Sequence, residues 1–307
     1  MKKLISLLLL AALCLSAFAA TAFADEADPS LEEGYVRELD GCTSEVRWCK
    51  NGEQNIFGRF YYPADFDPEQ SYPVVIMSHG LGSTCDMTEK MKWPQAVTAA
   101  GFVAYAYDFC GGSKNSKSDG DYLQMSVRTE QSDLSAVMDF VKEQSFVDAK
   151  QLFLLGQSQG GFVSAITAAA RPKEVKAMVL VYPALCLVDD LHTFVPDLSA
   201  LTGETFESAM GELGVVYARD GYDIDVMAEI AGYPGDVMVI HGLNDKVVPY
   251  TYSVEAVTNA YSAASSELVL ITGKKSAHGF EMVYNEGRDY AEGQAVSFLC
   301  DHVTAVS

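Results

Sequence analysis

Basic residues are scarce in this sequence. Its 307 residues include 21 Lys and Arg against 42 Asp and Glu, which gives a net charge of −21. This charge opposes sequence-independent attraction to nucleic acid or to an anionic lipid surface, because both are themselves negatively charged. We therefore expect neither nucleic acid nor a membrane as a partner.

Long apolar runs are also rare, and the one that is present lies at the N-terminus. Two lysines precede the apolar residues 4–20, and the small-x-small pattern at 22–24 is typical of a cleavage site. Residues 1–24 are therefore predicted to be a secretory signal peptide, with an uncleaved membrane anchor as the alternative. No second run is long enough to span a bilayer, so we expect a secreted or otherwise extracytoplasmic, soluble mature protein.

The sequence does not contain the cysteine and histidine spacings that are typical of metal sites. Among seven cysteines and five histidines there is no C-x-x-C pair and no cluster of the zinc type, so we expect neither metal nor cofactor. An oxidising compartment permits disulfides, although their pairing stays open. Six cysteines follow the N-terminal segment: Cys42, Cys49, Cys85, Cys110, Cys186 and Cys300.

No period of 20–50 residues recurs, which argues against a solenoid or a propeller. The sequence instead begins with alternating, β-rich residues 35–62, where breaks at Gly41 and at 51–52 predict antiparallel strands. Later apolar runs are short and continuous, which is typical of strands buried on both faces. These runs are residues 74–77, 102–106, 152–155, 177–181, 237–240 and 268–271.

Helical stretches such as 129–144 and 159–170 separate most of these runs. The β-α-β alternation predicts an α/β fold with a mainly parallel, doubly wound sheet and helices on both faces. Residues 184–232 break the alternation with acids, glycines and aromatics, and we expect them to form an insert over one end of the sheet. The predicted core is then residues 25–183 and 233–307.

One motif carries a specific chemistry. Gly156-Gln157-Ser158-Gln159-Gly160 follows a predicted strand and precedes a predicted helix, which is the context that G-x-S-x-G requires. Ser158 is the expected nucleophile, held in a strained turn, and a Cβ at either glycine would clash with neighbouring backbone. A fortuitous Gly/Ser turn is the alternative, and the placement between strand and helix argues against it.

A serine hydroxyl needs a base to take its proton and an acid to orient that base. Asp245 and His278 each lie in a loop after a predicted strand, so both are expected at the same edge of the sheet as the serine. We predict that His278 is the base and Asp245 the acid. Asp236 and Asp223 are rival acids that lie outside the post-strand loop.

The tetrahedral intermediate of acyl transfer needs hydrogen-bond donors for its developing negative charge. The sequence H-G-L-G at 79–82 follows a predicted strand and offers backbone N–H groups at the same edge of the sheet. We predict an oxyanion hole formed by the N–H groups of Leu81 and Gln159. The histidines His79 and His241 lie at strand ends, where packing and loop hydrogen bonds are expected to explain them.

These motifs occur together with Y-D-F-C-G-G-S at 107–113, H-G-L-N-D-K-V-V-P at 241–249 and A-H-G-F at 277–280. With this set, the chain resembles the α/β-hydrolases over roughly residues 61–300. It is most similar to the bacterial feruloyl (cinnamoyl) esterases and to relatives often labelled serine aminopeptidases.

The resemblance implies an α/β-hydrolase fold with a small lid insert after the sixth strand. It also implies a triad of Ser158, Asp245 and His278, with oxyanion donors at Leu81 and Gln159. This sequence departs from the group in its signal peptide and in extra β-structure near its N-terminus, and these departures bear on substrate identity.

The lid of the feruloyl esterases supplies an Asp and a Tyr that hold the phenolic hydroxyl of the hydroxycinnamate. The resemblance places these two residues at Asp190 and Tyr217, inside the predicted insert. The alternative for both is a surface or packing role, which is common for such residues in a polar lid.

Three functions are left open by the sequence. The leading prediction is a secreted serine carboxylesterase that cleaves a small ester substrate through an acyl-enzyme, with feruloyl esters as the implied class. A serine aminopeptidase-like enzyme is the second, in which Asp189, Asp190 and Asp197 would bind a free amine. The third is a non-catalytic binding protein on a hydrolase scaffold, and the intact Ser158 and His278 oppose it.

Overall fold

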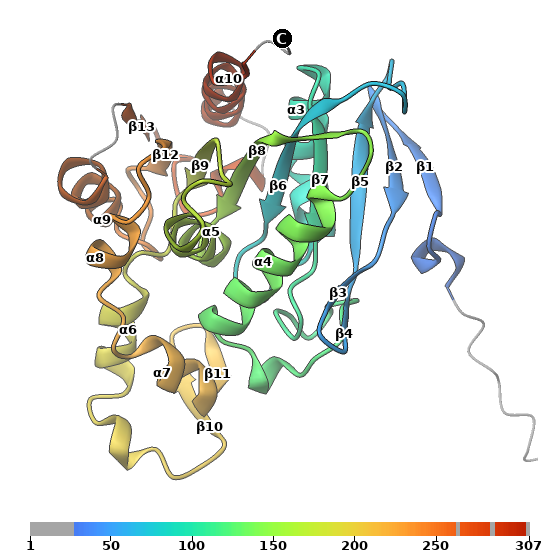
Figure 1. The fold of residues 1–307 in the computed structure, drawn as a ribbon. Coiled ribbons are helices and arrows are strands. Elements are labelled where there is room, and N and C mark those ends of the chain that lie inside the picture. The colour runs from blue at the N-terminus through green and yellow to red at the C-terminus, as the bar shows by residue number, and fades with distance from the viewer. Residues whose placement is uncertain (1–27, 262–264, 283–285, 305–307) are drawn as a thin grey trace, which may run out of the picture.

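The computed structural model describes residues 28–261, 265–282 and 286–304, so the predicted signal peptide lies outside the described residues. Within them, the main sheet has nine strands in the order β1-β2-β5-β7-β6-β8-β9-β12-β13 (Figure 1). Its antiparallel part contains β1 (Val36–Leu39), β2 (Cys42–Val46) and β5 (Gly58–Pro63). Its parallel part contains β6 (Tyr72–Ser78), β7 (Val103–Tyr107), β8 (Val147–Gln157), β9 (Ala177–Val181), β12 (Asp236–Gly242) and β13 (Ser266–Ile271).

The N-terminal strands form where the sequence predicts them. Gly41 and Gly52 have positive φ values of 79° and 59° in the turns between strands, a backbone conformation that favours glycine. The second of these turns closes a separate antiparallel hairpin. That hairpin consists of β3 (Cys49–Asn51) and β4 (Gln54–Ile56). The prediction of antiparallel strands followed by six parallel ones is confirmed, and five of the six are buried. The prediction that residues 268–271 are buried on both faces is wrong, because β13 (Ser266–Ile271) lies at the edge of the sheet and only its Ile271 is buried.

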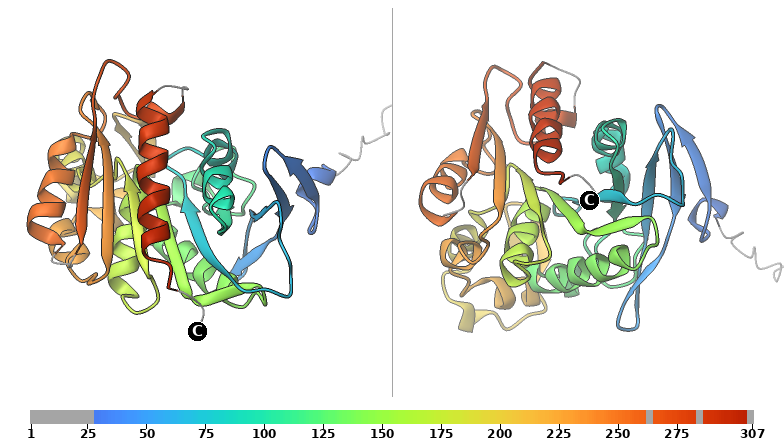
Figure 2. Two further views of the ribbon diagram at one scale, coloured as in Figure 1. Left: turned by 90° about the horizontal axis from the view of Figure 1, so that it is seen from above. Right: turned by 45° about the horizontal axis from the view of Figure 1, so that its top comes forward.

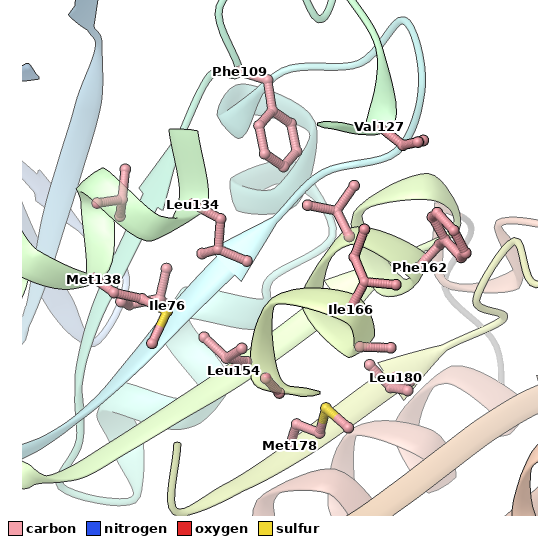
Figure 3. Packing of buried hydrophobic residues seen from close by; sticks show 14 of the residues in the cluster. Ile76, Phe109, Val127, Leu134, Met138, Leu154, Phe162, Ile166, Met178 and Leu180 are labelled. Carbon is pink, nitrogen blue, oxygen red and sulfur yellow. The ribbon is translucent and has the colours of Figure 1, made fainter. Parts of the chain in front are cut away.

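Helices cover both faces of the sheet (Figure 2). Side chains alternate along each buried strand, so in β6 Val74 and Ile76 join one hydrophobic core while Val75 and Met77 join the other. The first core packs against α4 (Val127–Lys142), α5 (Gln159–Ala170) and the π-helical turn η4 (Ala256–Ala260), and Figure 3 shows part of it. The second packs against α2 (Cys85–Lys90), α3 (Trp93–Ala99) and α10 (Glu286–Asp301). The predicted doubly wound α/β fold is confirmed.

Residues 184–232 lie between β9 and β12 and extend beyond one end of the sheet (Figure 1). β9 is the seventh strand of the main sheet along the described chain, one later than the resemblance implies, because β1 adds an N-terminal edge strand. The segment contains α6 (Leu187–Phe194), η3 (Leu198–Ala200), β10 (Thr205–Ser208), β11 (Gly211–Gly214), α7 (Val215–Gly221) and α8 (Val226–Ile230). We refer to residues 184–232 as the insert.

The insert is bound tightly to the core. Gly214 ends β11 so close to η2 (Tyr122–Gln124) that an added Cβ would lie 1.7 Å from the Leu123 carbonyl oxygen.

The remaining short elements connect the core strands and helices. They are η1 (Pro29–Leu31), η2 (Tyr122–Gln124), α9 (Tyr250–Glu255) and η5 (Phe280–Met282).

The six cysteines that follow the N-terminal segment are all free thiols in the structure, so none of the disulfides that the sequence permits is formed among the described residues. Within the same residues, none of the helices has the length and apolar character needed to cross a bilayer.

Candidate active site

Ser158 lies in the sharp turn between β8 and α5, with φ 51° and ψ −120°, a conformation that is rare for a residue with a side chain. The flanking glycines make this turn possible. A Cβ on Gly156 would lie 2.4 Å from the Gly160 carbonyl oxygen, and one on Gly160 would lie 2.3 Å from that of His79. The predicted clash is confirmed, and the turn leaves the serine half-buried at the carboxyl end of its strand.

A chain of hydrogen bonds connects Ser158 to the two residues predicted to act with it. His278 Nε2 lies 3.1 Å from Ser158 Oγ, and His278 Nδ1 lies 2.7 Å from Asp245 Oδ2. Because a carboxylate only accepts hydrogen bonds, Nδ1 carries the proton and Nε2 is free to accept the serine proton. Three loops that follow β8, β12 and β13 thus bring the predicted serine, acid and histidine together.

Asp245 is held as an anion by its surroundings. The backbone N–H groups of Val247 and Val248 both donate to Asp245 Oδ1 at 2.9 Å, while His241 Nε2 lies 3.4 Å from Oδ2. Burial alone would raise the pKa of this carboxyl, but the contacts with His241, His278 and the Val248 N–H outweigh burial and hold the pKa well below its usual range. The carboxylate therefore stays charged beside the imidazole.

The rival acids lie elsewhere. Asp236 begins β12, at the opposite end of that strand from Gly242, and its Oδ2 lies 2.9 Å from His302 Nε2. Asp223 is exposed in the insert. Only Asp245, among these three acids, contacts His278 in the structure.

The loop that follows β6 brings a second backbone segment next to the serine. His79 is buried, and its Nε2 accepts the Phe109 N–H at 3.1 Å while its Nδ1 donates to the Gly80 carbonyl at 2.8 Å. Burial lowers the pKa of His79, which agrees with this neutral, bridging role. The histidine therefore fixes the start of the loop that contains Leu81, as loop hydrogen bonding predicts.

Leu81 and Gln159 line the same pocket as Ser158. Within the described residues, no acceptor is paired with the backbone N–H of Leu81 or with that of Gln159, the first residue of α5. Two free N–H donors in residues that line the same pocket as the serine can serve an oxyanion, so the predicted pair is available for this role.

The pocket beside Ser158 has a volume of about 360 Å³ and lies between the core and the insert. Its surface is mostly apolar, and Asp190 and Lys246 are the charged residues in it. The insert supplies most of the lining, namely Ala184, Cys186, Leu187, Asp190, Leu191, Phe194, Ser208, Ala209, Met210, Leu213 and Tyr217. Both residues that the resemblance singled out in the insert are therefore at the pocket.

The acidic cluster expected for an aminopeptidase is not assembled here. Asp190 lines the pocket, whereas Asp189 accepts a hydrogen bond from the Tyr252 hydroxyl at 2.5 Å and lies in a separate hollow. Asp197 caps η3 through the Ser199 N–H at 2.9 Å. The structure thus leaves one of the three acids facing the pocket.

Glu130, which no sequence motif singled out, contacts the site through the side chain of Gln159. Its carboxyl is fully buried on α4 and accepts a hydrogen bond from Gln159 Nε2 at 2.8 Å. Burial raises the pKa of Glu130 to about 8, although the Gln159 hydrogen bond opposes this change. Helical spacing could have revealed it, because Val127, Glu130 and Leu134 fall on one face, and an acid on an apolar face needs a partner.

Glu281 and Tyr182 form a second buried group, behind His278. The Tyr182 ring lies 4.5 Å from the His278 ring between centroids, and its hydroxyl bonds to Glu281, which also accepts Gln157 Nε2 at 2.8 Å. Burial raises the pKa of the Glu281 carboxyl. No sequence pattern singles out Glu281, since its partners come from distant parts of the chain.

Across the described residues, no group of three or more His, Cys, Asp or Glu side chains is arranged to hold a metal ion.

Known sequences that are similar to this chain identify its family. A model of the prolyl oligopeptidase family matches residues 89–305, well over half of the chain. The chain is 31% identical over 121 residues to the uncharacterized protein YcjY of Escherichia coli K12, which covers 38% of this chain and 37% of that protein. It is 24% identical over 244 residues to the acylamino-acid-releasing enzyme of Mus musculus, covering 74% of this chain and 31% of that enzyme. The matches thus span about a third of the length of these relatives.

Solved structures share the architecture. Est1E from Butyrivibrio proteoclasticus, with ferulic acid bound, has a TM-score of 0.71 at 21% identity, covering 83% of this chain and 98% of that one. Acetyl xylan esterase 1 from Thermoanaerobacterium sp. JW/SL YS485 has a TM-score of 0.62 at 22% identity, covering 89% and 88%. The chain therefore has the α/β-hydrolase fold and belongs to the prolyl oligopeptidase family.

Proposed function

We propose that this protein is a serine carboxylesterase that works through an acyl-enzyme. The observation that carries the proposal is the hydrogen-bonded chain from Ser158 Oγ through His278 to Asp245, at 3.1 and 2.7 Å, at the edge of an apolar pocket. This arrangement of nucleophile, base and orienting acid is the one that acyl transfer to serine requires.

In the proposed reaction, Ser158 Oγ attacks the ester carbonyl carbon while His278 Nε2 takes the serine proton. The N–H groups of Leu81 and Gln159 stabilise the oxyanion, and the protonated histidine then gives its proton to the departing alcohol. A water molecule hydrolyses the acyl-enzyme through the same histidine and restores the serine. Asp245 stabilises the imidazolium and keeps the ring in place.

We propose an aromatic, hydroxycinnamate-like acyl group as the substrate class. The pocket is mostly apolar, which suits a ring, and the exposed Asp190 carboxylate on its wall could accept a hydrogen bond from a phenolic hydroxyl. The structure of Est1E with ferulic acid bound, a protein with the same fold, supports this choice.

A second candidate is the release of N-acylated residues from peptides. The family match and the likeness to the acylamino-acid-releasing enzyme favour it. Asp190 is the single one of the three insert acids that lines the pocket, so a neutral acylated end would suit this site better than a free amine. This candidate uses the same serine, histidine and acid.

A substrate panel separates the two candidates. The purified protein would be assayed with p-nitrophenyl acetate, p-nitrophenyl butyrate, methyl ferulate and N-acetylalanyl p-nitroanilide, with Ser158→Ala as the blank. Serine-dependent hydrolysis of the esters, with little anilide cleavage, is the expected result. Anilide cleavage without ester hydrolysis would favour the second candidate, and equal rates for wild type and blank would contradict both.

We also propose that the protein is exported and that residues 1–24 are removed. The basic, apolar and small-x-small pattern of this segment supports the proposal. Intact mass measurement of protein recovered from outside the cells of the native host should give a chain that begins at Asp25. Recovery of the uncleaved chain from the cell membrane would contradict it.

A further inference from the structure

Gln159 is used in two ways at the proposed site. Its backbone N–H is one of the two free donors beside Ser158, while its side-chain amide is buried and bonded at both ends. Gln159 Nε2 donates to Glu130 Oε2 at 2.8 Å, and Gln159 Oε1 accepts the Tyr217 hydroxyl at 2.6 Å. The side chain is thus held from two sides directly after the nucleophile.

The two partners come from different parts of the molecule. Glu130 projects from α4 in the core, and Tyr217 projects from α7 in the insert. The exposed fractions of Glu130, Gln159 and Tyr217 are 1%, 2% and 5%. Because these groups are shielded from water, loss of one partner would leave a buried polar atom unpaired, and the amide would have to move to find another.

The same insert is attached to the same helix at two more points. Ser126 Oγ, which caps α4, donates to Asp220 Oδ2 at 2.5 Å. Arg128 makes two hydrogen bonds to the Glu229 carboxylate, at 2.5 and 2.8 Å. These contacts hold α7 and α8 beside α4, so the position of Tyr217 relative to Glu130 is fixed by more than their shared glutamine.

We propose that the Tyr217 hydroxyl and the Glu130 carboxyl are positioning groups that hold the Gln159 backbone N–H where the oxyanion forms. The inference rests on the proposed function, since it assigns a role within the serine mechanism. It gives Tyr217 a different role from the one that the resemblance implies. The Tyr217 hydroxyl hydrogen is already donated to Gln159, so its principal effect is on catalysis with every substrate rather than on phenolic substrates alone.

The test measures the reactivity of Ser158 without depending on the natural substrate. A fluorophosphonate forms a bond between Ser158 Oγ and phosphorus as the P–F bond breaks, with fluoride leaving and the serine proton passing to His278. The developing charge on the phosphoryl oxygen needs the same donors as an ester oxyanion. The rate of this labelling would be measured for wild type, Tyr217→Phe, Glu130→Gln and Glu130→Ala.

Tyr222→Phe is the matched control. Tyr222 follows α7 in the same insert, and its hydroxyl makes a 3.4 Å contact with the Pro196 carbonyl, away from Gln159. Thermal unfolding of each variant would show that only folded protein is compared. Values of kcat and KM for p-nitrophenyl acetate and methyl ferulate complete the measurement.

Tyr217→Phe is expected to lower the labelling rate and kcat for both esters by about 10-fold, less than the loss of a whole oxyanion donor, with little change in KM for the acetate. Glu130→Ala should have a similar effect, and Glu130→Gln should restore most of the rate because its amide oxygen can still accept from Gln159. Tyr222→Phe should match wild type.

A wild-type labelling rate in Tyr217→Phe would overturn the inference. A loss confined to methyl ferulate would also overturn it and would make Tyr217 a substrate-binding residue. The proposed function fails in a different way, with wild-type protein that is labelled no faster than Ser158→Ala.

Discussion

At the residue scale, Ser158 has a strained backbone and lines the pocket, and its hydroxyl lies 3.1 Å from His278 Nε2. We predict that Ser158→Ala yields a folded protein whose ester hydrolysis is lowered by about 10⁴-fold or more, because members of such a unit act together. Initial rates with p-nitrophenyl acetate, alongside circular dichroism of the purified variant, would check this. Near wild-type activity in the variant would remove Ser158 from the mechanism.

The choice of acid can be tested separately. Asp245→Asn should lose several orders of magnitude in kcat, but less than Ser158→Ala, since an amide in place of the carboxylate mis-sets the His278 tautomer and leaves the nucleophile in place. Asp236→Asn is the matched control and should keep most of the activity, because Asp236 pairs with His302 instead. A greater loss from the control than from Asp245→Asn would show that the acid was wrongly assigned.

Single residues differ in how well the sequence predicts them. Ser158, Asp245 and His278 each follow a strand of the parallel sheet, and the carboxyl ends of such strands meet at one edge, so their meeting could be foreseen. Glu281 could not, because its partners are Gln157, at the end of β8, and Tyr182, directly after β9, and no local pattern connects them. The spacing of residues along the chain shows which side of a helix is buried and which residues follow a strand. Contacts between residues that are distant in the sequence can be seen only in the folded structure.

At the element scale, α4 contains a carboxyl where a helix would normally bury an apolar side chain. Folding raises the pKa of Glu130 from an ordinary 4.5 to about 8, so the folded state binds a proton that the unfolded chain releases. The stability that this proton provides is full below pH 4.5 and is lost as pH rises towards 8. The loss amounts to about 1.4 kcal/mol for each pH unit in that interval.

We therefore predict that the free energy of unfolding falls more steeply between pH 5 and pH 8 in wild type than in Glu130→Gln, whose amide stays neutral. Urea denaturation at both pH values would measure the difference. Glu53→Gln, on an exposed turn, is the control and should follow wild type. Parallel curves for wild type and Glu130→Gln would show that Glu130 does not take up a proton on folding.

The sequence predicts the strands of the core better than the short elements of the insert. Strands such as β9 and β12 are continuous apolar runs, and their hydrophobic pattern alone identifies them. The insert between them was predicted only as a break in the alternation, because its short helices and its β10–β11 hairpin depend on packing against α4 and η2. Elements of four to eight residues contain too few turns for a periodic pattern to stand out.

At the scale of the whole molecule, core and insert together form the pocket, so substrate choice can be separated from chemistry. Asp190 lines the pocket on the insert side, and its Oδ2 contacts Cys186 Sγ at 3.2 Å. We predict that Asp190→Ala weakens kcat/KM for methyl ferulate by about 1–3 kcal/mol, since a phenolic hydroxyl would lose its acceptor. The value for p-nitrophenyl acetate should be almost unchanged.

Matched kcat/KM measurements on wild type and Asp190→Ala would decide the point. Equal losses on both esters would show that Asp190 supports the fold of the insert instead of binding substrate. Asp189→Ala is a suitable comparison, because that neighbouring acid lies in a separate hollow and bonds to Tyr252.

The paired hydrogen bonds between Arg128 and Glu229 bear on which substrates the pocket can accept. Together with the contact from Ser126 to Asp220, they attach α7 and α8 of the insert to α4 in the core, and Tyr217 of α7 lines the pocket. The part of the pocket that α7 lines is thus held against the core by contacts that lie outside the pocket itself. We therefore expect hydrolysis to depend on substrate size, with esters too large for the pocket of about 360 Å³ cleaved more slowly than p-nitrophenyl acetate.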